Sequence, residues 1–396
     1  MLQASWIVCL FLSLFYLHYA VIYPKKKDAM KEEKYFPVLI AFNPTDLARN
    51  VKVEEWDKTF FGVVEEMKKQ EREGKAAILN PIVGPGRQTL KTCFSPFCKV
   101  FEEPITGSTR MKGGTATKLI LEMIFFALMA RTKSEENSLV GFLSDFQKAC
   151  TETYSSSLPS LSAVIEEAGE AVKKGGRLVY ISEKESVGML AMIDSSECPP
   201  TFGSSPGDVQ AFVRGGWKKL FQQDFFLTKK EGSESLSKIE LNEFEPRKGD
   251  CVIWVSVDEE ACEELKKVIF SSEKIGAKTF RIHFQFSSKS TPKENETWVL
   301  LSEPSNKVWT AQVLEMSVKW TLNAISTCAH IIKGKVYENR MMDLSVSNNK
   351  LYFRSISIIS KFANVESCVA EDCLLRSIYL QERVSEEVRQ SQISER

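Results

Sequence analysis

The chain has 396 residues, enough for two domains of ordinary size with substantial cores. Its hydrophobic fraction of 43% and charged fraction of 26% are typical of a folded globular protein and exclude a disordered one. Lysine plus arginine number 52, as do aspartate plus glutamate, so the chain has no formal net charge. This balance argues against a general electrostatic grip on nucleic acid, and we expect no nucleic-acid partner.

Cysteine and histidine form no pattern typical of a metal centre. Ten cysteines are scattered along the chain, and the two close pairs, which begin at Cys93 and Cys368, lack the CxxC spacing of a zinc site. The three histidines are His18, His283 and His330. We therefore expect reduced, mostly buried thiols, no metal and no cofactor.

The N-terminal residues 5–23 (SWIVCLFLSLFYLHYAVIY) form an apolar run about long enough to cross a bilayer, followed by three lysines. The run lacks the positive leader and the clear cleavage site of a signal peptide. As a membrane anchor it would keep the lysine-rich flank, and hence the rest of the chain, in the cytosol. Alternatively, it replaces part of a fold through a different first exon or a faulty gene model.

The first third of the chain predicts a small α/β unit. Residues 36–42 (FPVLIAF) predict a buried parallel strand, which needs partner strands to form a sheet. A helix is predicted at 53–70, a second strand at 76–79 and a strongly apolar helix at 113–132. The last of these is too short and too mixed to be a convincing membrane span.

A second α/β pattern follows, and it predicts a doubly wound parallel sheet. The predicted strands are at 177–182, 251–257, 278–286 and 298–301. The predicted helices are at 138–154, 158–173, 208–221 and 259–270, with one more directly after the first strand. From residue 313 every predicted segment is helical, at 313–332, 336–343, 347–362 and 368–381, before a polar and frayed end.

The run 105–114 (ITGSTRMKGG) is a small, hydroxyl-rich loop that leads into a helix. Backbone N–H groups at a helix N-terminus favour an anion. Ser108 and Thr109 add hydroxyl donors, while Arg110 and Lys112 add positive charge, so the loop suits a phosphate. An ordinary glycine-rich turn with a capped helix fits the spacing equally well.

Three motifs carry a resemblance to a known family. Residues 105–118 (ITGSTRMKGGTATK) resemble the signature of N-acetylmuramic acid 6-phosphate etherases and of their animal relatives, the glucokinase regulatory proteins. The other two motifs lie at 190–203 (LAMIDSSECPPTFG) and at 319–335 (KWTLNAISTCAHIIKGK), the latter continuing to Arg354. The resemblance covers about residues 36–385, and the chain is more similar to the animal regulators.

The resemblance implies an α/β fold with two sugar isomerase (SIS) lobes, each a doubly wound parallel sheet, and a C-terminal helical cap. On this basis, we expect the first lobe to be incomplete and the second complete. The expected divisions are a divergent apolar segment at 1–34, a remnant of the first lobe at 35–135, the second lobe at 136–312, and C-terminal helices with a partial cap at 313–396.

The resemblance does not imply an enzyme here. The etherases use two carboxylates, and general acid–base chemistry needs both within reach of one sugar. Glu197 matches the acid, but the second carboxylate should lie near Thr228, where lysines follow. After the strand at 177–182, residues 183–187 (EKESV) are too bulky and acidic to cradle a phosphate well. We therefore expect no catalytic residue, with Glu197 as a sugar-hydroxyl ligand or a lone helix-end carboxylate.

The remaining implied roles concern ligands and a partner. Lys350 and Arg354 share a helix face and, by resemblance, reach the ligand phosphate from the cap; a solvated basic face is the alternative. The regulators bind glucokinase, an interaction that fructose 6-phosphate favours and fructose 1-phosphate opposes. The contact with glucokinase should fall near Leu300, Leu301 and Ser302, where Ser302 replaces an aromatic anchor.

The implied function is therefore inhibition of glucokinase in response to fructose phosphates, in the cytoplasm and nucleus. The alternatives are an etherase-like lyase, an inactive truncated isoform, and a membrane-anchored protein if residues 5–23 are a genuine anchor. The family's first lobe begins upstream of residue 36, its cap continues beyond Arg396, and residues 87–104 are an insertion. We thus expect truncation at both ends, and an anchor in mid-fold would leave the strand at 36–42 without its sheet.

Overall fold

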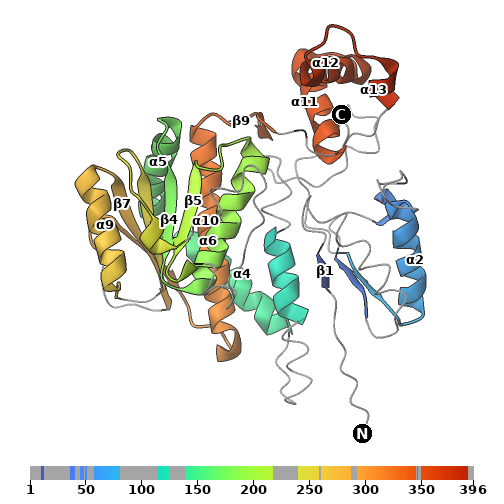
Figure 1. The fold of residues 1–396 in the computed structure, drawn as a ribbon. Coiled ribbons are helices and arrows are strands. Elements are labelled where there is room, and N and C mark those ends of the chain that lie inside the picture. The colour runs from blue at the N-terminus through green and yellow to red at the C-terminus, as the bar shows by residue number, and fades with distance from the viewer. Residues whose placement is uncertain are drawn as a thin grey trace. The chain divides into compact units, whose positions relative to one another are not determined.

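The computed structural model describes residues 10–12, 36–40, 45–48, 50, 58–80, 114–124, 139–216, 240–257, 260–286, 292–344, 346 and 349–390. They belong to two compact units, Met1–Leu121 and Glu122–Arg396, whose helices and strands are drawn in Figure 1. No helix within the described residues combines the length and the apolar character needed to span a membrane.

The first unit contains a parallel sheet in the order β1-β2-β3. Its core joins Leu39 of the central strand to Val64 and Met67 of the helix α2, and the Thr59 hydroxyl caps that helix by accepting the Gly62 N–H at 3.1 Å. The elements are β1 (Leu10–Leu12), β2 (Val38–Ile40), η1 (Thr45–Leu47), α2 (Phe60–Arg72) and β3 (Ala77–Leu79). The partner strand that β2 needs is thus supplied by the apolar N-terminal run, because Leu10 pairs with Val38.

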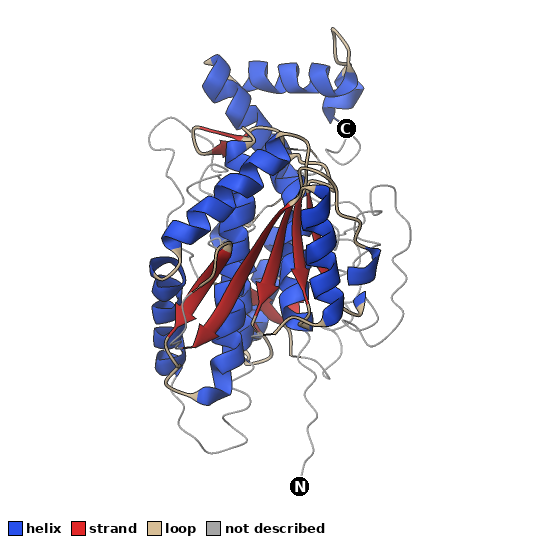
Figure 2. Ribbon diagram, turned by 90° about the vertical axis from the view of Figure 1, so that its left-hand side faces the viewer, coloured by secondary structure: helices blue, strands red, loops and turns tan. Residues whose placement is uncertain are grey.

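The second unit is built on a five-stranded parallel sheet in the order β5-β4-β6-β7-β8. The strands are β4 (Leu178–Ser182), β5 (Val209–Val213), β6 (Cys251–Ser256), β7 (Lys278–Phe286) and β8 (Glu296–Leu301). The helices are α4 (Leu139–Ser155), α5 (Leu158–Lys173), α6 (Glu185–Phe202), α9 (Glu263–Ile275) and α10 (Thr310–Ile332). Helices lie on both sides of the sheet, as Figure 2 shows, so the predicted doubly wound α/β fold is confirmed.

Each face of this sheet is buried by alternate residues of the same strands. Val179 and Ile181 of β4 point to the face covered by α9, where they pack with Leu265. Tyr180, between them, points to the opposite face, and its hydroxyl lies 3.4 Å from the Leu322 carbonyl oxygen of α10. Strands buried on both faces explain the continuous apolar runs in the sequence.

Two predicted helices are wrong, because tertiary packing makes them strands. Val209–Val213, expected within a helix at 208–221, is the edge strand β5, whose Phe212 packs on Phe244. The segment expected as a helix at 336–343 is a hairpin of β9 (Val336–Tyr337) and β10 (Arg340–Met341). Its turn residues Glu338 and Asn339 have φ angles of 45° and 60°, which no right-handed helix accepts.

The C-terminal helices form a small core of their own. Tyr352 and Ile356 of α11 (Asn349–Ala363) pack against Leu374 and Leu375 of α12 (Ser367–Tyr379). The Tyr352 hydroxyl donates to Glu371 Oε1 at 2.6 Å. The helices are α11 (Asn349–Ala363), α12 (Ser367–Tyr379) and α13 (Glu386–Gln390). The helices predicted at 347–362 and 368–381 are therefore confirmed.

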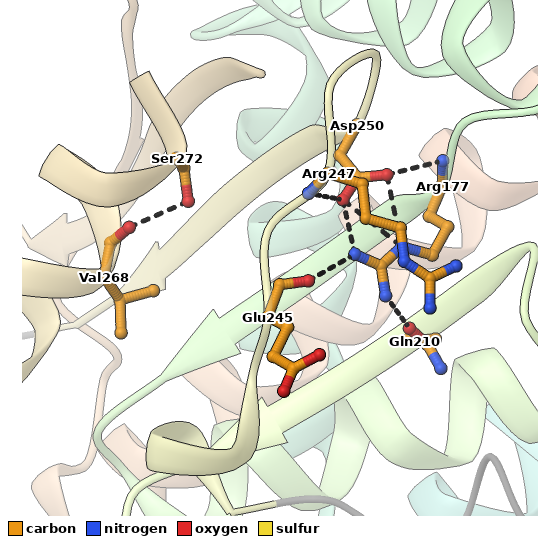
Figure 3. A network of polar contacts seen from close by, with 7 residues as sticks. All are labelled: Arg177, Gln210, Glu245, Arg247, Asp250, Val268 and Ser272. Atoms are coloured by element: carbon orange, nitrogen blue, oxygen red, sulfur yellow. Dashed lines mark hydrogen bonds and ion pairs between the residues drawn. The ribbon is translucent and has the colours of Figure 1, made fainter. Parts of the chain in front are cut away.

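A buried ion pair lies at the amino-terminal ends of β4 and β6 in the second sheet (Figure 3). Arg177 precedes β4 and Asp250 precedes β6; they are 9% and 1% exposed, and their Nη2 and Oδ2 atoms lie 2.5 Å apart. The guanidinium also donates to Gln210 Oε1 at 2.9 Å and to the Glu245 carbonyl oxygen at 2.7 Å. The Arg247 N–H donates to Asp250 Oδ2 at 2.9 Å, so both charges are well satisfied by hydrogen bonds.

Candidate functional site

The strand order of the second sheet marks one place for a ligand. Strand β4 lies between β5 and β6, so the connections that leave β4 and β5 run in opposite directions. In open α/β sheets, ligands bind outside the carboxyl ends of the strands at such a switch point. Here those ends are Ser182 of β4 and Ser256 of β6.

A carboxylate of the chain itself occupies this position. Glu183 follows β4 directly, and its Oε1 accepts a hydrogen bond of 2.5 Å from the backbone N–H of Cys262, the N-cap of α9. A helix N-terminus attracts anions through its free N–H groups and its dipole. The end of α9 that faces the switch point is thus already bound by Glu183, in line with the poor phosphate cradle expected from residues 183–187.

A second acidic side chain binds the turn after β5. Glu240 Oε1 accepts the Gly215 N–H at 2.8 Å. Gly216 has a φ of +50°, and a Cβ there would lie 2.8 Å from Glu240 Oε2, so this close approach favours glycine. Residues 217–239, which include Thr228 and the lysines after it, lie outside the described residues. Glu183 and Glu240 therefore each accept a backbone N–H near the carboxyl ends of the strands.

Glu197, the predicted sugar ligand, lies half-buried in the last third of α6. Pro199 and Pro200 follow it inside the helix and have no N–H, so they cannot donate to the carbonyls one turn before them. Asp194 lies one turn earlier on the same face of the helix. Asp194 is 2% exposed, and its Oδ1 accepts a hydrogen bond of 3.1 Å from the Ser326 hydroxyl of α10.

Asp194 lies in an environment that favours its neutral form. Burial raises its pKa to about 7, while Lys319 of α10, the Ser326 hydroxyl and the Tyr180 hydroxyl act in the opposite direction and Glu197 adds to the rise. Lys319 is itself 6% exposed. No hydrogen bond or ion pair joins its ammonium group to any residue that the structure describes.

His330 of α10 packs against the C-terminal end of α6. Its Nδ1 donates to the Ser326 carbonyl oxygen at 2.7 Å, its ring stacks on Phe202 with centroids 4.3 Å apart, and burial lowers its pKa, which favours the neutral ring. At the next residue, Gly203, a Cβ would meet the Asp343 carbonyl oxygen at 1.7 Å. The second and third sequence motifs are therefore packed against each other.

These contacts were not predicted. Asp194 and Lys319 lie inside the motifs at 190–203 and 319–335, so the motifs gave a signal that these positions matter. The spacing of the motifs could not show that α6 and α10 are adjacent. Within the described residues, no group of three or more histidine, cysteine or acidic side chains is arranged to hold a metal ion.

The other predicted ligand residues lie in two further parts of the chain, and their role stays a prediction. Ser108, Thr109 and Arg110 lie outside the described residues, although residues 114–124 after them are helical, within the helix predicted at 113–132. Lys350 lies in the first turn of α11, and its side chain is not described. Arg354, one turn later, is half-buried, with its Nη1 3.8 Å from Met341 Sδ in β10.

The predicted partner-binding residues lie at the end of the edge strand β8. Leu300 is 36% exposed, whereas Leu301 is 3% exposed and belongs to the core. The Leu300 N–H donates to the Ser156 hydroxyl at 3.1 Å, and Ser302 donates to Glu152 through its N–H at 2.8 Å and its hydroxyl at 2.6 Å. Residues of α4 and Ser156 thus cover the edge of β8. Of the three residues, Leu300 alone has an exposed apolar side chain.

Two family models match this fold. Residues 154–288 match the second SIS domain of glucokinase regulatory protein, and residues 338–396 match the C-terminal lid domain of that protein. The etherase of Halalkalibacterium halodurans that acts on N-acetylmuramic acid 6-phosphate is 34% identical over 224 residues, which cover 54% of this chain and 70% of that protein. The chain belongs to the SIS-domain family of the glucokinase regulatory proteins and these etherases.

Within the family, the animal regulators match over a greater length. Glucokinase regulatory protein of Homo sapiens is 30% identical over 383 residues, covering 91% of this chain and 57% of that protein. The protein of the same name from Rattus norvegicus is 29% identical over 380 residues, with the same coverage. The chain thus spans little more than half the length of these regulators.

Proposed function

We propose that this chain is a non-enzymatic regulator that binds sugar phosphates and inhibits glucokinase, a hexokinase-type enzyme. The observation that carries the proposal is the Glu183 carboxylate bound at the N-terminus of α9. A second lobe that holds its own carboxylate at the switch point is poorly suited to bind and turn over a phosphorylated substrate there. The two matches to regulator domains support the same conclusion.

In this proposal, the sugar phosphate is bound by residues from three parts of the chain. Ser108, Thr109 and Arg110 hold the phosphate, and Glu197 accepts a hydrogen bond from a sugar hydroxyl. Lys350 and Arg354 reach the phosphate from the C-terminal helices. Fructose 6-phosphate favours the state that binds glucokinase and fructose 1-phosphate opposes it, since each ligand shifts the equilibrium by its differential affinity for the two states.

Capture of glucokinase by the immobilised full chain tests this function. We expect capture that increases with fructose 6-phosphate and decreases with fructose 1-phosphate, in extracts of cytoplasm and of nuclei alike. Leu300→Ser should weaken capture, whereas the buried Leu301→Val should leave it unchanged. No capture under any of these conditions would contradict the proposal.

An etherase-like lyase is the second candidate, because the bacterial relative is 34% identical and 70% of its length is covered. Incubation of the chain with N-acetylmuramic acid 6-phosphate, followed by detection of released lactate, separates the two. We expect no turnover. Turnover that Glu197→Gln abolishes would favour the lyase instead.

A further inference from the structure

The interface between α6 and α10 holds buried charge that its packing role does not require. Asp194 is 2% exposed; its Oδ1 accepts a hydrogen bond from Ser326 Oγ, whereas its Oδ2 is buried without a hydrogen-bond partner within the described residues, and Lys319 of α10 is 6% exposed. Buried charges are costly unless they are paired and hydrogen-bonded. A cluster of this kind is therefore a candidate for a functional role.

The geometry links the cluster to Glu197. Asp194 and Glu197 are one turn apart on α6 and interact electrostatically, and Lys319 acts on Asp194 from α10. The titratable groups that face Asp194 are Tyr180 of β4, Glu197 and Cys198 of α6, and Lys319 of α10. Lys319 is the cation of this set and acts on Asp194, whereas Glu197 is the nearby anion.

We propose that Asp194, together with Lys319, is a positioning group that sets the charge around Glu197 and makes sugar binding by this chain depend on pH. The inference rests on the proposed function, in which Glu197 accepts a hydrogen bond from a sugar hydroxyl. It adds a control on that contact by a residue that does not touch the ligand.

The direction of the control follows from the charges. With Asp194 protonated, no second negative charge lies next to the Glu197 carboxylate. With Asp194 ionised, a second negative charge lies one turn from Glu197, offset in part by the interaction of Asp194 with Lys319, and it raises the energetic cost of keeping the Glu197 carboxylate ionised. Sugar binding should therefore weaken as the pH rises through the pKa of Asp194, which burial raises to about 7.

Three variants separate the steps of this argument. Asp194→Asn keeps this position neutral with a side chain of nearly the same shape. The affinity of this variant for fructose 6-phosphate, relative to wild type, should therefore match that of the protonated wild type at every pH. Ser326→Ala removes the hydroxyl that stabilises the carboxylate, so the transition should move to higher pH. Asp372→Asn, a control on α12 whose carboxylate pairs with Arg376 and Arg389, should follow the wild-type profile.

The test is calorimetric titration of the full chain with fructose 6-phosphate between pH 5.5 and 8.5. Because the phosphate of the ligand also titrates, the quantity that decides is the ratio of wild-type to Asp194→Asn affinity at each pH. This ratio should fall by about tenfold across the range. In a Glu197→Gln background the fall should disappear, which a purely structural role of Asp194 would not produce.

Each result has a defined meaning. A constant ratio, or a fall that persists in the Glu197→Gln background, overturns the inference while the proposed function stands. No binding by wild type or any variant at any pH, with thermal unfolding showing folded protein, contradicts the proposed function itself. A falling ratio that depends on Glu197 supports both.

Discussion

The second lobe contains two buried charge clusters that differ in how well their charges are satisfied. At the amino edge of the sheet, Arg177 and Asp250 are in direct contact, and backbone and side-chain groups complete their hydrogen bonds. Between α6 and α10, Asp194 and Lys319 are equally buried but form no ion pair. The Arg177–Asp250 pair therefore stabilises the structure, whereas the Asp194 carboxyl, which has no ion pair among the described residues, can change its protonation state near neutral pH.

The largest effect should come from breaking the satisfied pair. Asp250→Ala leaves the Arg177 guanidinium buried without its carboxylate and should lower the free energy of unfolding by about 3–5 kcal/mol. Urea denaturation of the full chain measures this change. A loss below about 1 kcal/mol would show that solvent reaches the pair and would break the comparison.

The cluster of Asp194 and Lys319 should make the free energy of unfolding depend on pH. The pKa of Asp194 is raised from 3.8 in the unfolded chain to about 7 in the folded one, so the folded state binds more protons between these values. Stability contributed by protonated Asp194 is present below pH 4 and is lost as the pH rises through 7. The free energy of unfolding of wild type relative to Asp194→Asn should fall by on the order of 3 kcal/mol over this window.

Denaturation of both proteins at pH 5, 6, 7 and 8 measures this difference. A difference between wild type and Asp194→Asn that does not vary with pH would place the two clusters in the same class.

A smaller effect is expected for Glu183, which binds the α9 N-terminus with one charged hydrogen bond. Glu183→Ala removes this bond and the favourable interaction with the helix dipole, and should cost about 1 kcal/mol. Thermal unfolding at low salt measures it. Added sulfate should restore part of the lost stability if the N-terminus of α9, without Glu183, binds anions. If Glu183→Ala costs no stability, the main support for a switch point already bound by Glu183 is lost.

The smallest effect should come from an exposed pair. Glu170, on the surface of α5, accepts from Lys174 at 2.9 Å. Lys174 lowers the pKa of Glu170, and Glu170 raises the pKa of Lys174. Glu170→Gln should leave the unfolding midpoint unchanged within error, because water screens exposed charges. A clear shift at this position would mean that exposed ion pairs also stabilise the chain, so burial would not explain the larger effects expected at the two clusters.

The sequence predicted the second sheet well where strands are buried on both faces. The strands β4 and β6 could be predicted because every residue of both is buried, and consecutive burial of this kind is typical of strands inside a parallel sheet. The edge strand β5 was misassigned because Val209–Val213 includes Gln210 and follows a polar turn, which leaves too short an apolar signal. The β9–β10 hairpin was missed because Glu338 and Asn339 turn the chain without a glycine.

The candidate site was predictable only in part. Glu197 was predicted from its motif and stays a prediction. The interactions of Asp194 with Lys319 and Ser326 join segments more than a hundred residues apart, and local periodicity carries no information about such interactions. The same limit hid the pairing of Leu10–Leu12 with Val38–Ile40, which depends on the packing of the first unit.

The measurement that most directly tests the central claim is the effect of fructose 6-phosphate on glucokinase activity in the presence of the full chain. We expect the chain to inhibit glucokinase, fructose 6-phosphate to strengthen the inhibition, and Glu197→Gln to remove the response to the sugar phosphate. Glucokinase activity that is unaffected by the chain at any concentration of fructose 6-phosphate would contradict this claim.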